Sequence, residues 1–380
     1  MHKKTVLHII SSLSDGGAEG TLYRLVLFDN EYKHIVVSLT DGGIYLKKLI
    51  AIDVDVYLLS MPRGKVTIYG ILKLYRLIKK SHLDIIQTWM YHANLLGGLF
   101  AKFAGNNNII WGIRGPYDKQ RTSFTTKIIV RFCALFSFWL PRRIISNSYF
   151  AKNAHLAIGY CSSKMVVIDN GYSTKNKPYS DEDILSLSLK YHVKNNSPIL
   201  GMVARFDSHK DHENIISALS ILVDKNIEFT CLLVGSGMIE SNKDLSSLIS
   251  QYNVGSFVRL VGRYDDIPLM MSFLDLHVLS SAAESFPNVL AEAMLAGTPC
   301  VTTDVGDAKR IIGDTGWVVP PENAIILASQ IETAICEMKN TSNWTARQEA
   351  CKNRIENKYN MSNMISSYND LWADVINAKK

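Results

Sequence analysis

The stretch SAAESFPNVLAEAMLAGTPCVTTD contains two glutamates, Glu284 and Glu292, with seven residues between them. Pro287 favours a first helical turn and Gly297 a helix end, so the sequence predicts a helix with Glu284 at its entrance and Glu292 inside it. Apart from Asn288, the other residues of this helix are apolar or small, so we expect it to be buried nearly all round. A buried carboxylate needs a cationic partner or hydroxyl donors. A diol such as a ribose suits Glu292, and sugar hydroxyls suit Glu284.

Two cations, Arg205 and Lys210, lie close together in the stretch GMVARFDSHKDHEN. Arg205 closes a predicted strand, and Lys210 follows in the loop before a predicted helix. Both therefore belong to the carboxyl end of a strand, where doubly wound folds bind their ligands. A planar guanidinium beside a compact ammonium suits a diphosphate, although two basic residues in a loop can also serve solubility alone.

Two weaker signals lie in the first half of the chain. Gly17 follows Gly16 in SLSDGGAEG, where backbone amides at a helix start can approach a phosphate, or where the chain only makes a tight turn. The pattern is not GxGxxG, which argues against the common dinucleotide-binding fingerprint. His92, in TWMYHANLLGG, falls where a predicted strand meets a helix, and is either a structural histidine or a group beside the ligand.

A metal site has one candidate in the sequence. Asp53 and Asp55 form an Asp-x-Asp pattern of the kind that can hold a divalent cation. They open a predicted strand, and no other cluster of ligand residues accompanies them in the sequence. We therefore predict that the protein needs neither a metal nor a cofactor.

The elements that must position these residues follow a regular alternation. Short β-branched runs alternate with longer helical patterns, from TVLHIISS to KMVVIDNG and again from PILGMVAR to GWVVP. This rhythm predicts an α/β protein of two doubly wound, Rossmann-like parallel-sheet domains facing a central cleft. We place the domains at residues 1–175 and 176–359, with a polar linker over Asp169–Pro198. A final helical segment at residues 360–380 could fold back onto the first domain.

The charge is unevenly distributed between the two halves. The chain has a formal net charge of +6, yet residues 1–175 hold 23 Lys and Arg against 10 Asp and Glu, while the remainder holds 18 against 25. The basic half predicts an anionic partner, namely nucleic acid, anionic lipid or a phosphorylated substrate. Nucleic acid is disfavoured because the sequence has no recognition motif and no zinc-finger spacing.

Cysteine usage and apolar runs bear on the compartment. The six cysteines are scattered without a CxxC pair, which favours buried thiols in a reducing compartment. The N-terminal residues do not form a signal-peptide pattern, so we predict a cytoplasmic protein. The stretch TKIIVRFCALFSFWLPRR is uncharged and apolar only from Phe132 to Leu140, far short of the roughly 20 residues that span a bilayer. It is either a core helix beneath a sheet or a segment in a membrane interface.

Taken together, these residues resemble glycosyltransferase family 4, which comprises retaining enzymes of the GT-B fold. The resemblance covers nearly the whole chain. Within the family, the sequence is most similar to bacterial enzymes of O-antigen, capsule or related polysaccharide assembly. The motifs that carry it are SLSDGGAEG, TWMYHANLLG, VARFDSHKDHEN, LVGSG, LVGRYDDIP and SSAAESFPNVLAEAMLAGTPCVTTDVGD. One departure is Asp307, where many relatives have glycine, so we expect no donor contact there.

The resemblance implies a role for each matching residue. Arg205 and Lys210 would hold the donor diphosphate, Glu284 would face the donor sugar, and Glu292 would hold the ribose. The remaining donor-site residues implied by the family are Ser285, Phe286, Pro287 and Asn288 beside the sugar, Arg263 and Tyr264 near the base, Gly17 near the phosphates, and His92 near the reacting centre.

The resemblance also implies a reaction. A sugar would move from a nucleotide-sugar donor, a UDP-hexose or UDP-N-acetylhexosamine, to a lipid-linked saccharide acceptor at the anionic inner surface of a membrane, with which the protein would associate peripherally. The transfer would be metal-independent and retaining, and the leaving diphosphate would help to take the acceptor's proton. Two alternatives are a nucleotide-sugar epimerase of the same architecture, which would need no acceptor, and a non-catalytic sugar-binding module, which would not explain diphosphate cations beside paired glutamates.

Overall fold

The chain folds into two compact units in a computed structural model that describes residues 3–115, 117, 123–173, 179–194 and 197–378. Unit 1 comprises Met1–Gly171 with Met361–Lys380, and unit 2 comprises Tyr172–Asn360. The domain boundary that we predicted after residue 175 lies outside the described residues, and the division itself falls at Gly171. The C-terminal segment belongs to unit 1.

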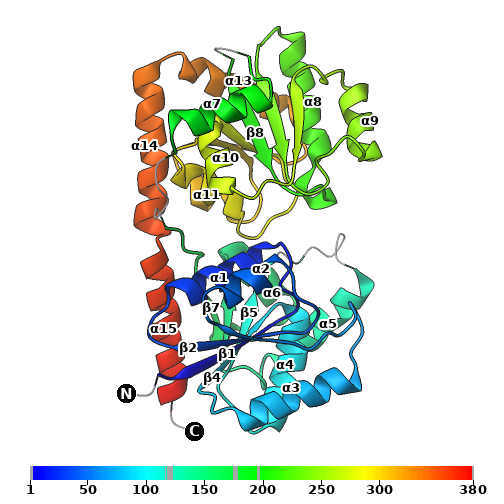
Figure 1. The fold of residues 1–380 in the computed structure, drawn as a ribbon, viewed down its shortest axis with the longest axis vertical. Helices are drawn as coiled ribbons and strands as arrows, with labels where there is room; N and C mark the ends of the chain where they lie inside the picture. Colours follow the sequence, from blue (N-terminus) through cyan, green and yellow to red (C-terminus); the bar gives the residue numbers. More distant parts are fainter. Residues whose placement is uncertain (1–2, 116, 118–122, 174–178, 195–196, 379–380) are drawn as a thin grey trace. The chain divides into compact units, whose positions relative to one another are not determined.

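Unit 1 is built on a seven-stranded parallel sheet with the strand order β3-β2-β1-β4-β5-β6-β7 (Figure 1). Its strands coincide with the predicted β-branched runs: β1 Thr5–Ile10, β2 Lys33–Ser38, β3 Asp55–Leu58, β4 Ile85–Trp89, β5 Ile109–Ile113, β6 Arg143–Ser146 and β7 Met165–Val167. The central strands β4 and β5 are buried at every position. Strands that are buried along their whole length are expected where helices cover both faces of a parallel sheet.

Helices cover both faces of the unit 1 sheet. One core lies between the sheet and helices α3 to α6, which span Ile68–Lys80, Tyr91–Phe103, Phe124–Phe136 and Tyr149–Ala157. A second core lies on the opposite face, under α1 Gly17–Phe28, α2 Ile44–Ile50 and α15 Met361–Asn377. The final helix therefore packs on the first domain, as the red helix beside β2 and β4 shows in Figure 1.

A buried chain of hydrogen bonds holds α15 to this sheet. The Trp89 indole donates to Nδ1 of His8 at 3.2 Å, so a neutral His8 carries its proton on Nε2, which lies 3.0 Å from Nδ1 of His34. By the same logic His34 donates from Nε2 to the Asp29 carboxylate at 3.0 Å. Asp29 in turn accepts a hydrogen bond of 3.2 Å from Asn369 on α15. Because indole can only donate, the pattern gives every hydrogen bond in this chain one direction, from Trp89 toward Asp29.

Unit 2 is built on a six-stranded parallel sheet with the order β10-β9-β8-β11-β12-β13. The strands are β8 Ile199–Val203, β9 Thr230–Val234, β10 Val258–Gly262, β11 Leu276–Leu279, β12 Cys300–Thr303 and β13 Trp317–Val319. Both sheets have the predicted parallel strands, so the sequence located every strand of each unit.

Two helical layers cover the unit 2 sheet. One core lies under α8 His212–Asp224, α9 Lys243–Gln251 and α13 Ala324–Met338. The opposite core lies under α7 Asp181–Lys190, α10 Ile267–Phe273, α11 Asn288–Leu295, α12 Ala308–Ile312 and α14 Thr341–Lys358.

The prediction of a linker over Asp169–Pro198 is wrong for Asp181–Lys190. There the chain forms α7, which begins with a capping box. The Ser180 hydroxyl accepts from the Asp183 backbone N–H at 3.2 Å, and the Asp183 carboxylate accepts from the Ser180 backbone N–H at 2.9 Å. Leu187 anchors the helix in the unit 2 core. The Ser-x-x-Asp pattern was a readable helix start, but the polar composition around it outweighed that signal.

Candidate functional site

The predicted diphosphate cations lie at the topological switch point of unit 2. Strands β8 and β11 are neighbours, but the chain leaves β8 toward β9 and leaves β11 toward β12, on opposite sides. At such a point the loops after the two strands diverge and leave a crevice at the carboxyl edge of the sheet. Arg205 and Lys210 follow β8, and the segment from Ser280 to Pro287 follows β11.

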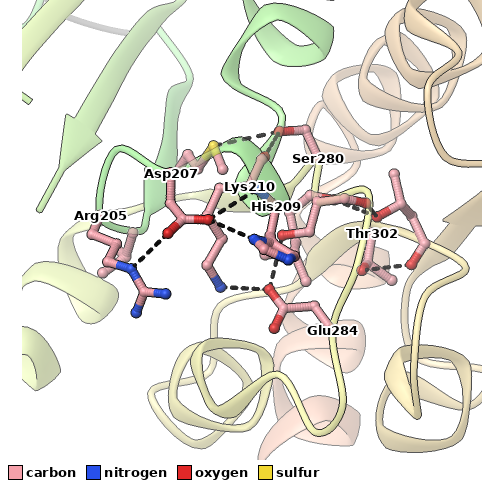
Figure 2. A network of polar contacts seen from close by, with 12 residues as sticks. Arg205, Asp207, His209, Lys210, Ser280, Glu284 and Thr302 are labelled. Carbon is pink, nitrogen blue, oxygen red and sulfur yellow. Dashed lines mark hydrogen bonds and ion pairs between the residues drawn. The ribbon is translucent and has the colours of Figure 1, made fainter. Parts of the chain in front are cut away.

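Lys210 and Glu284 form an ion pair across these two loops. The Lys210 ammonium lies 2.5 Å from Oε1 of Glu284 (Figure 2). The Ser281 hydroxyl donates to the same oxygen at 2.8 Å. The side chains are only 17% and 13% exposed, so the charges attract more strongly than a surface pair does. An ammonium has three N–H donors and a carboxylate two oxygens, so each group can bind a ligand while keeping this contact.

Asp207 orients the second cation. Its carboxylate accepts from Nε of Arg205 at 3.2 Å and from the backbone N–H and ring Nδ1 of His209 at 3.0 Å and 2.8 Å (Figure 2). Burial pushes the pKa of Asp207 upward, but the hydrogen bonds from His209 and the nearby Arg205 charge outweigh it and lower the pKa to about 2. The carboxylate is therefore ionised at any physiological pH.

The two loops are also tied together through their backbones. The His209 carbonyl accepts from the amides of Ala282 and Ala283, at 2.9 Å and 3.3 Å. The Ser280 hydroxyl lies 3.1 Å from the Lys210 carbonyl. These contacts hold the loop after β8 in register with the loop after β11. Sequence reasoning missed Asp207, His209 and Ser281, although RFDSHK placed two of them between the cations that it did identify.

Two histidines beneath the site are buried and uncharged. Burial, together with the nearby Lys210 charge, lowers the pKa of His212 to about 4 and that of His277 to about 3. At neutral pH neither imidazole carries charge. Within this cluster of described side chains, Arg205 and Lys210 therefore supply the positive charge that a bound anion would meet.

The helix α11 differs from the prediction that it is buried nearly all round. It begins at Asn288 with Pro287 as its cap residue, and Gly297 follows its end with a φ of 86°. Leu290, Ala291, Ala293 and Met294 face the core, but the stripe formed by Asn288, Glu292, Leu295 and Ala296 is half-buried. Glu292 thus lies on the half-buried side of the helix.

The segment between β11 and α11 presents backbone more than side chains. Ser285, Phe286 and Pro287 are buried, and the Phe286 ring packs edge-on against Tyr359 in the core, with ring centres 5.8 Å apart. Asn288 accepts a hydrogen bond of 2.6 Å from the Tyr172 hydroxyl. Phe286 therefore anchors the segment, and any contact it makes with a ligand must come from its main chain.

The loop after β12 packs against the main chain of this segment. Gly306 has a φ of 57°, and a Cβ built on it would lie 2.5 Å from the Ser285 carbonyl oxygen and 2.7 Å from that of Glu284. Only glycine allows this close approach. The next residue, Asp307, donates its amide to Ser285 at 2.9 Å, and its carboxylate pairs with Arg310. Asp307 therefore has a structural role in this loop.

Arg263 and Tyr264 lie farther along the same edge of the sheet. They follow β10, the edge strand, which β9 separates from β8. Arg263 is exposed, and the half-buried Tyr264 ring lies 5.8 Å from the Lys190 ammonium. They share the carboxyl edge of the sheet with the switch-point residues.

In unit 1, Gly17 and His92 also lie at a switch point. They begin α1 and α4, which follow the neighbouring strands β1 and β4. Gly16 caps α1 without a side-chain hydrogen bond, and Glu19 turns back to accept from the Ser12 hydroxyl at 3.0 Å. His92 is exposed, and the desolvation it does experience lowers its pKa. The left-handed φ of 72° at Met90 sets the direction in which α4 starts.

The Asp-x-Asp pattern lies away from both switch points. Asp55 opens the edge strand β3 and pairs with Lys33 at 3.3 Å, and Asp53 lies in the preceding turn. Among the residues that the structure describes, no group of three or more His, Cys, Asp or Glu side chains is placed to hold a metal ion.

Two family profiles match the chain, one for each unit. The profile described as Glycosyltransferase Family 4 matches residues 16–176, and the profile described as Glycosyl transferases group 1 matches residues 187–361. Together they leave only short segments of the chain unmatched, and the second profile contains the whole switch-point cluster of unit 2.

Characterised and solved relatives agree with these profiles. The chain is 23% identical over 320 residues to the Escherichia coli UDP-Gal:alpha-D-GlcNAc-diphosphoundecaprenol alpha-1,3-galactosyltransferase, covering 81% of this chain and 79% of that protein. It is 24% identical to the Staphylococcus aureus capsular polysaccharide biosynthesis glycosyltransferase CapM, covering 94% and 87%. The structure of Anabaena Alr3699/HepE in complex with UDP and glucose superimposes with a TM-score of 0.86 at 21% identity, covering 98% and 100%. These likenesses confirm the GT-B fold.

Proposed function

Since this chain belongs to glycosyltransferase family 4, we propose that it moves a sugar from a nucleotide-sugar donor to a lipid-linked saccharide in bacterial O-antigen, capsule or related polysaccharide biosynthesis. The donor that we favour is a UDP-hexose or UDP-N-acetylhexosamine. The names of two relatives support the donor and the acceptor class, since one uses UDP-Gal with a diphosphoundecaprenol-linked sugar and the other serves capsule synthesis. On this proposal the protein works at the cytoplasmic face of the membrane.

The observation that carries the proposal is the pairing of Lys210 with Glu284 at the switch point, next to Arg205. A cation that touches a carboxylate there can bind a diphosphate oxygen with its other protons while it orients the carboxylate. The second carboxylate oxygen of Glu284 can then accept from hydroxyls of the donor sugar. A simple sugar-binding site has no use for two cations at this point.

In the proposed reaction the acceptor oxygen forms a bond to the anomeric carbon while the bond from that carbon to the diphosphate breaks. The proton of the acceptor hydroxyl passes to the leaving phosphate oxygen on the same face of the sugar, so the configuration is retained. Arg205 and Lys210 stabilise the negative charge that develops on the leaving group. Glu292 holds the ribose, and His92 lies near the reacting sugar.

A donor screen tests the proposal directly. The purified protein is incubated without acceptor with a panel of UDP-, GDP- and ADP-sugars, and slow release of free sugar is scored by mass spectrometry. We expect hydrolysis of one UDP-sugar, and faster consumption when an undecaprenyl-diphosphate-linked sugar is added. An epimerised sugar released at full rate without acceptor would contradict the transferase assignment, and so would the absence of turnover with every donor and acceptor pair.

Metal independence is tested in the same assay. We expect EDTA to leave activity largely intact, whereas Arg205→Ala or Lys210→Ala lowers kcat by at least about 100-fold, the scale for removing one group that stabilises developing charge. A matched control is Lys352→Ala, which removes an exposed cation from α14. Complete loss of activity with EDTA, restored by Mn²⁺, would direct attention to Asp53 and Asp55 instead.

A further inference from the structure

Helix α5 is apolar on its outer face as well as its inner face. Its inner residues Val130, Cys133 and Ala134 pack in the unit 1 core. Its outer residues follow the helical repeat and are large, apolar and exposed: Phe124 at 76%, Ile128, Phe132 and Leu135 at 68%. A helix at the surface of a domain normally turns polar residues outward, so this stripe needs an explanation.

The apolar stripe continues beyond the helix. Phe138 and Trp139, in the turn after α5, are 63% and 53% exposed, and Phe103 at the end of the neighbouring α4 is 66% exposed. We call the set of seven side chains the α5 face: Phe103, Phe124, Ile128, Phe132, Leu135, Phe138 and Trp139. One third of the exposed large apolar side chains in the described residues belong to it.

Cations border the α5 face. Arg131 is exposed within the stripe, the Lys102 ammonium lies 5.4 Å from the centre of the Trp139 ring, and the Lys164 ammonium donates to the Phe138 carbonyl at 2.7 Å. From Ile85 to Ile168 the sequence has ten Lys and Arg residues but one acidic residue. Aromatic and aliphatic side chains ringed by cations match a bilayer interface with anionic headgroups.

The neighbouring helix layer has the same character. Helices α3, α4 and α5 pack side by side on one face of the sheet (Figure 1). Ile68, Tyr69 and Leu72 are exposed at the start of α3, and Arg76, Lys79 and Lys80 follow on its outer side. An extended apolar and basic layer fits a planar lipid surface better than it fits a compact ligand.

The structure excludes Arg142 and Arg143 from this surface, although the sequence grouped them with the same stretch. Arg142 donates to the carbonyls of Val375 and Ala378, so it anchors the end of α15 on the opposite layer. Arg143 opens β6 and donates to the Arg142 carbonyl. Reversing their charge would disturb the packing of α15 and would not test lipid binding.

We propose that the α5 face inserts into the interface of a bilayer that contains anionic lipid, with Arg131, Lys102 and Lys164 at the level of the headgroups. The aromatic rings would lie at the boundary between headgroups and acyl chains. This docking surface rests on the proposed function for its purpose, since a lipid-linked acceptor is reached from such a surface. Among the described residues, no helix is long and apolar enough to cross a membrane.

Vesicle co-sedimentation of the full chain tests the surface without any transfer reaction. The vesicles are phosphatidylcholine alone, or two parts phosphatidylcholine to one part phosphatidylglycerol. We expect binding to the anionic vesicles at low salt and a steep fall at high salt. Phe132→Ser with Leu135→Ser lowers the partition coefficient at least about tenfold. Arg131→Glu lowers it at least about fivefold.

Matched controls separate docking from general surface effects. Leu185→Ser with Leu189→Ser removes two exposed leucines from helix α7 of unit 2, and Lys352→Glu reverses an exposed charge on α14. Both controls should bind vesicles like the unmodified protein. The α5 variants should keep the unmodified rate of donor hydrolysis, so that loss of lipid binding is distinguished from loss of the proposed activity.

Two results would overturn the inference. One is equal binding of the α5 variants and the unmodified protein to anionic vesicles. The other is absence of vesicle binding together with a dimer in analytical ultracentrifugation that Phe132→Ser with Leu135→Ser converts to a monomer, which would assign the α5 face to a second copy of the chain. Failure of the donor screen alone would leave the docking result standing.

Discussion

At the scale of single residues, the site of unit 2 depends on side chains that reach across two loops. Lys210 and Glu284 are 74 positions apart in the sequence, and the switch point brings their charged atoms to 2.5 Å. Asp207 sets the direction of Arg205, and Gly306 lets the loop after β12 approach the main chain of Glu284. Each of these contacts suggests a variant whose effect differs from simple loss of stability.

The two glutamates should separate turnover from nucleotide affinity. We expect Glu284→Gln to lower kcat mainly, because glutamine can still accept from Lys210 and Ser281 while the charge facing the sugar is lost. Glu292→Gln should instead weaken the binding of free nucleotide, because a ribose contact is the same in ground and transition states. Calorimetry with UDP, GDP and ADP measures the second effect. Unchanged affinity in a folded Glu292→Gln protein would reject the ribose assignment.

Gly306→Ala should lower kcat/KM by at least about tenfold, because its Cβ would displace the main chain that carries Glu284. Gly297→Ala is a matched control in the same unit, with a similarly positive φ of 86° and no heavy atom within 4 Å of the added Cβ. Both variants carry a left-handed strain of about 1 kcal/mol. Steady-state kinetics and thermal melting of the pair decide the matter, and equal activity in the two would reject a positioning role for Gly306.

At the scale of elements, α15 shows how a distant segment completes a domain. Its residues Tyr368, Trp372 and Val375 are buried in the unit 1 core, and Arg114 donates to the Tyr368 hydroxyl. The chain from Trp89 through His8 and His34 to Asp29 ends on Asn369 of the same helix. The helix is therefore held by apolar packing, by hydrogen bonds from Arg114 and Arg142, and by the hydrogen-bond chain that ends on Asn369.

Asp29→Asn should loosen this helix. Burial raises the pKa of Asp29, but hydrogen bonds from His34 and from the Glu31 amide outweigh it and keep the pKa below the ordinary value. The carboxylate is therefore charged at neutral pH, and replacing it with an amide weakens a charge-assisted contact to His34. We expect a loss of about 2 kcal/mol in the free energy of unfolding. Hydrogen exchange should rise along α15.

The control for this variant is Asp370→Asn, which changes an exposed carboxylate of α15 itself. It should leave hydrogen exchange and unfolding unchanged. If Asn at position 29 left exchange along α15 at the unmodified rate, the hydrogen-bond chain would have no part in holding the helix.

At the scale of the whole molecule, buried histidines set the response to acid. Burial lowers the pKa of His155 and of His212 to about 4 and that of His277 to about 3, and it lowers the pKa of His8 well below its ordinary value of 6.5. In the unfolded chain each would take up a proton as the pH falls below 6.5. The folded state would not, so the stability that is present above pH 6.5 decreases as the pH falls toward the folded pKa values.

Each unit contains two of these histidines, so its free energy of unfolding should fall by up to about 3 kcal/mol per pH unit below 6.5. Thermal unfolding followed between neutral pH and about pH 5 gives the slope. Calorimetry in buffers of different ionisation enthalpy counts the protons taken up. A melting temperature that stays constant over this range would show that the histidines are solvated in the folded chain.

The local sequence determined the strands, most of the helices around the sites and the positions of Arg205, Lys210, Glu284 and Glu292 along the chain. These are properties of short windows, in which apolar periodicity and turn residues act directly. Helix α14 was not predicted, because Trp344, Cys351 and Ile355 are its only buried residues and its composition is polar.

Only the tertiary structure decided which distant groups meet. The pairing of Lys210 with Glu284, the support of that loop by Gly306 and the docking of α15 depend on strand order and on which face of a sheet each helix covers. For α5 the sequence left two alternatives, a core helix or a segment in a membrane interface. In the structure the helix has both a face that is buried in the core and an apolar face that is exposed. A local pattern records that a helix is apolar, but burial of one side and exposure of the other depend on neighbours that are remote in the chain.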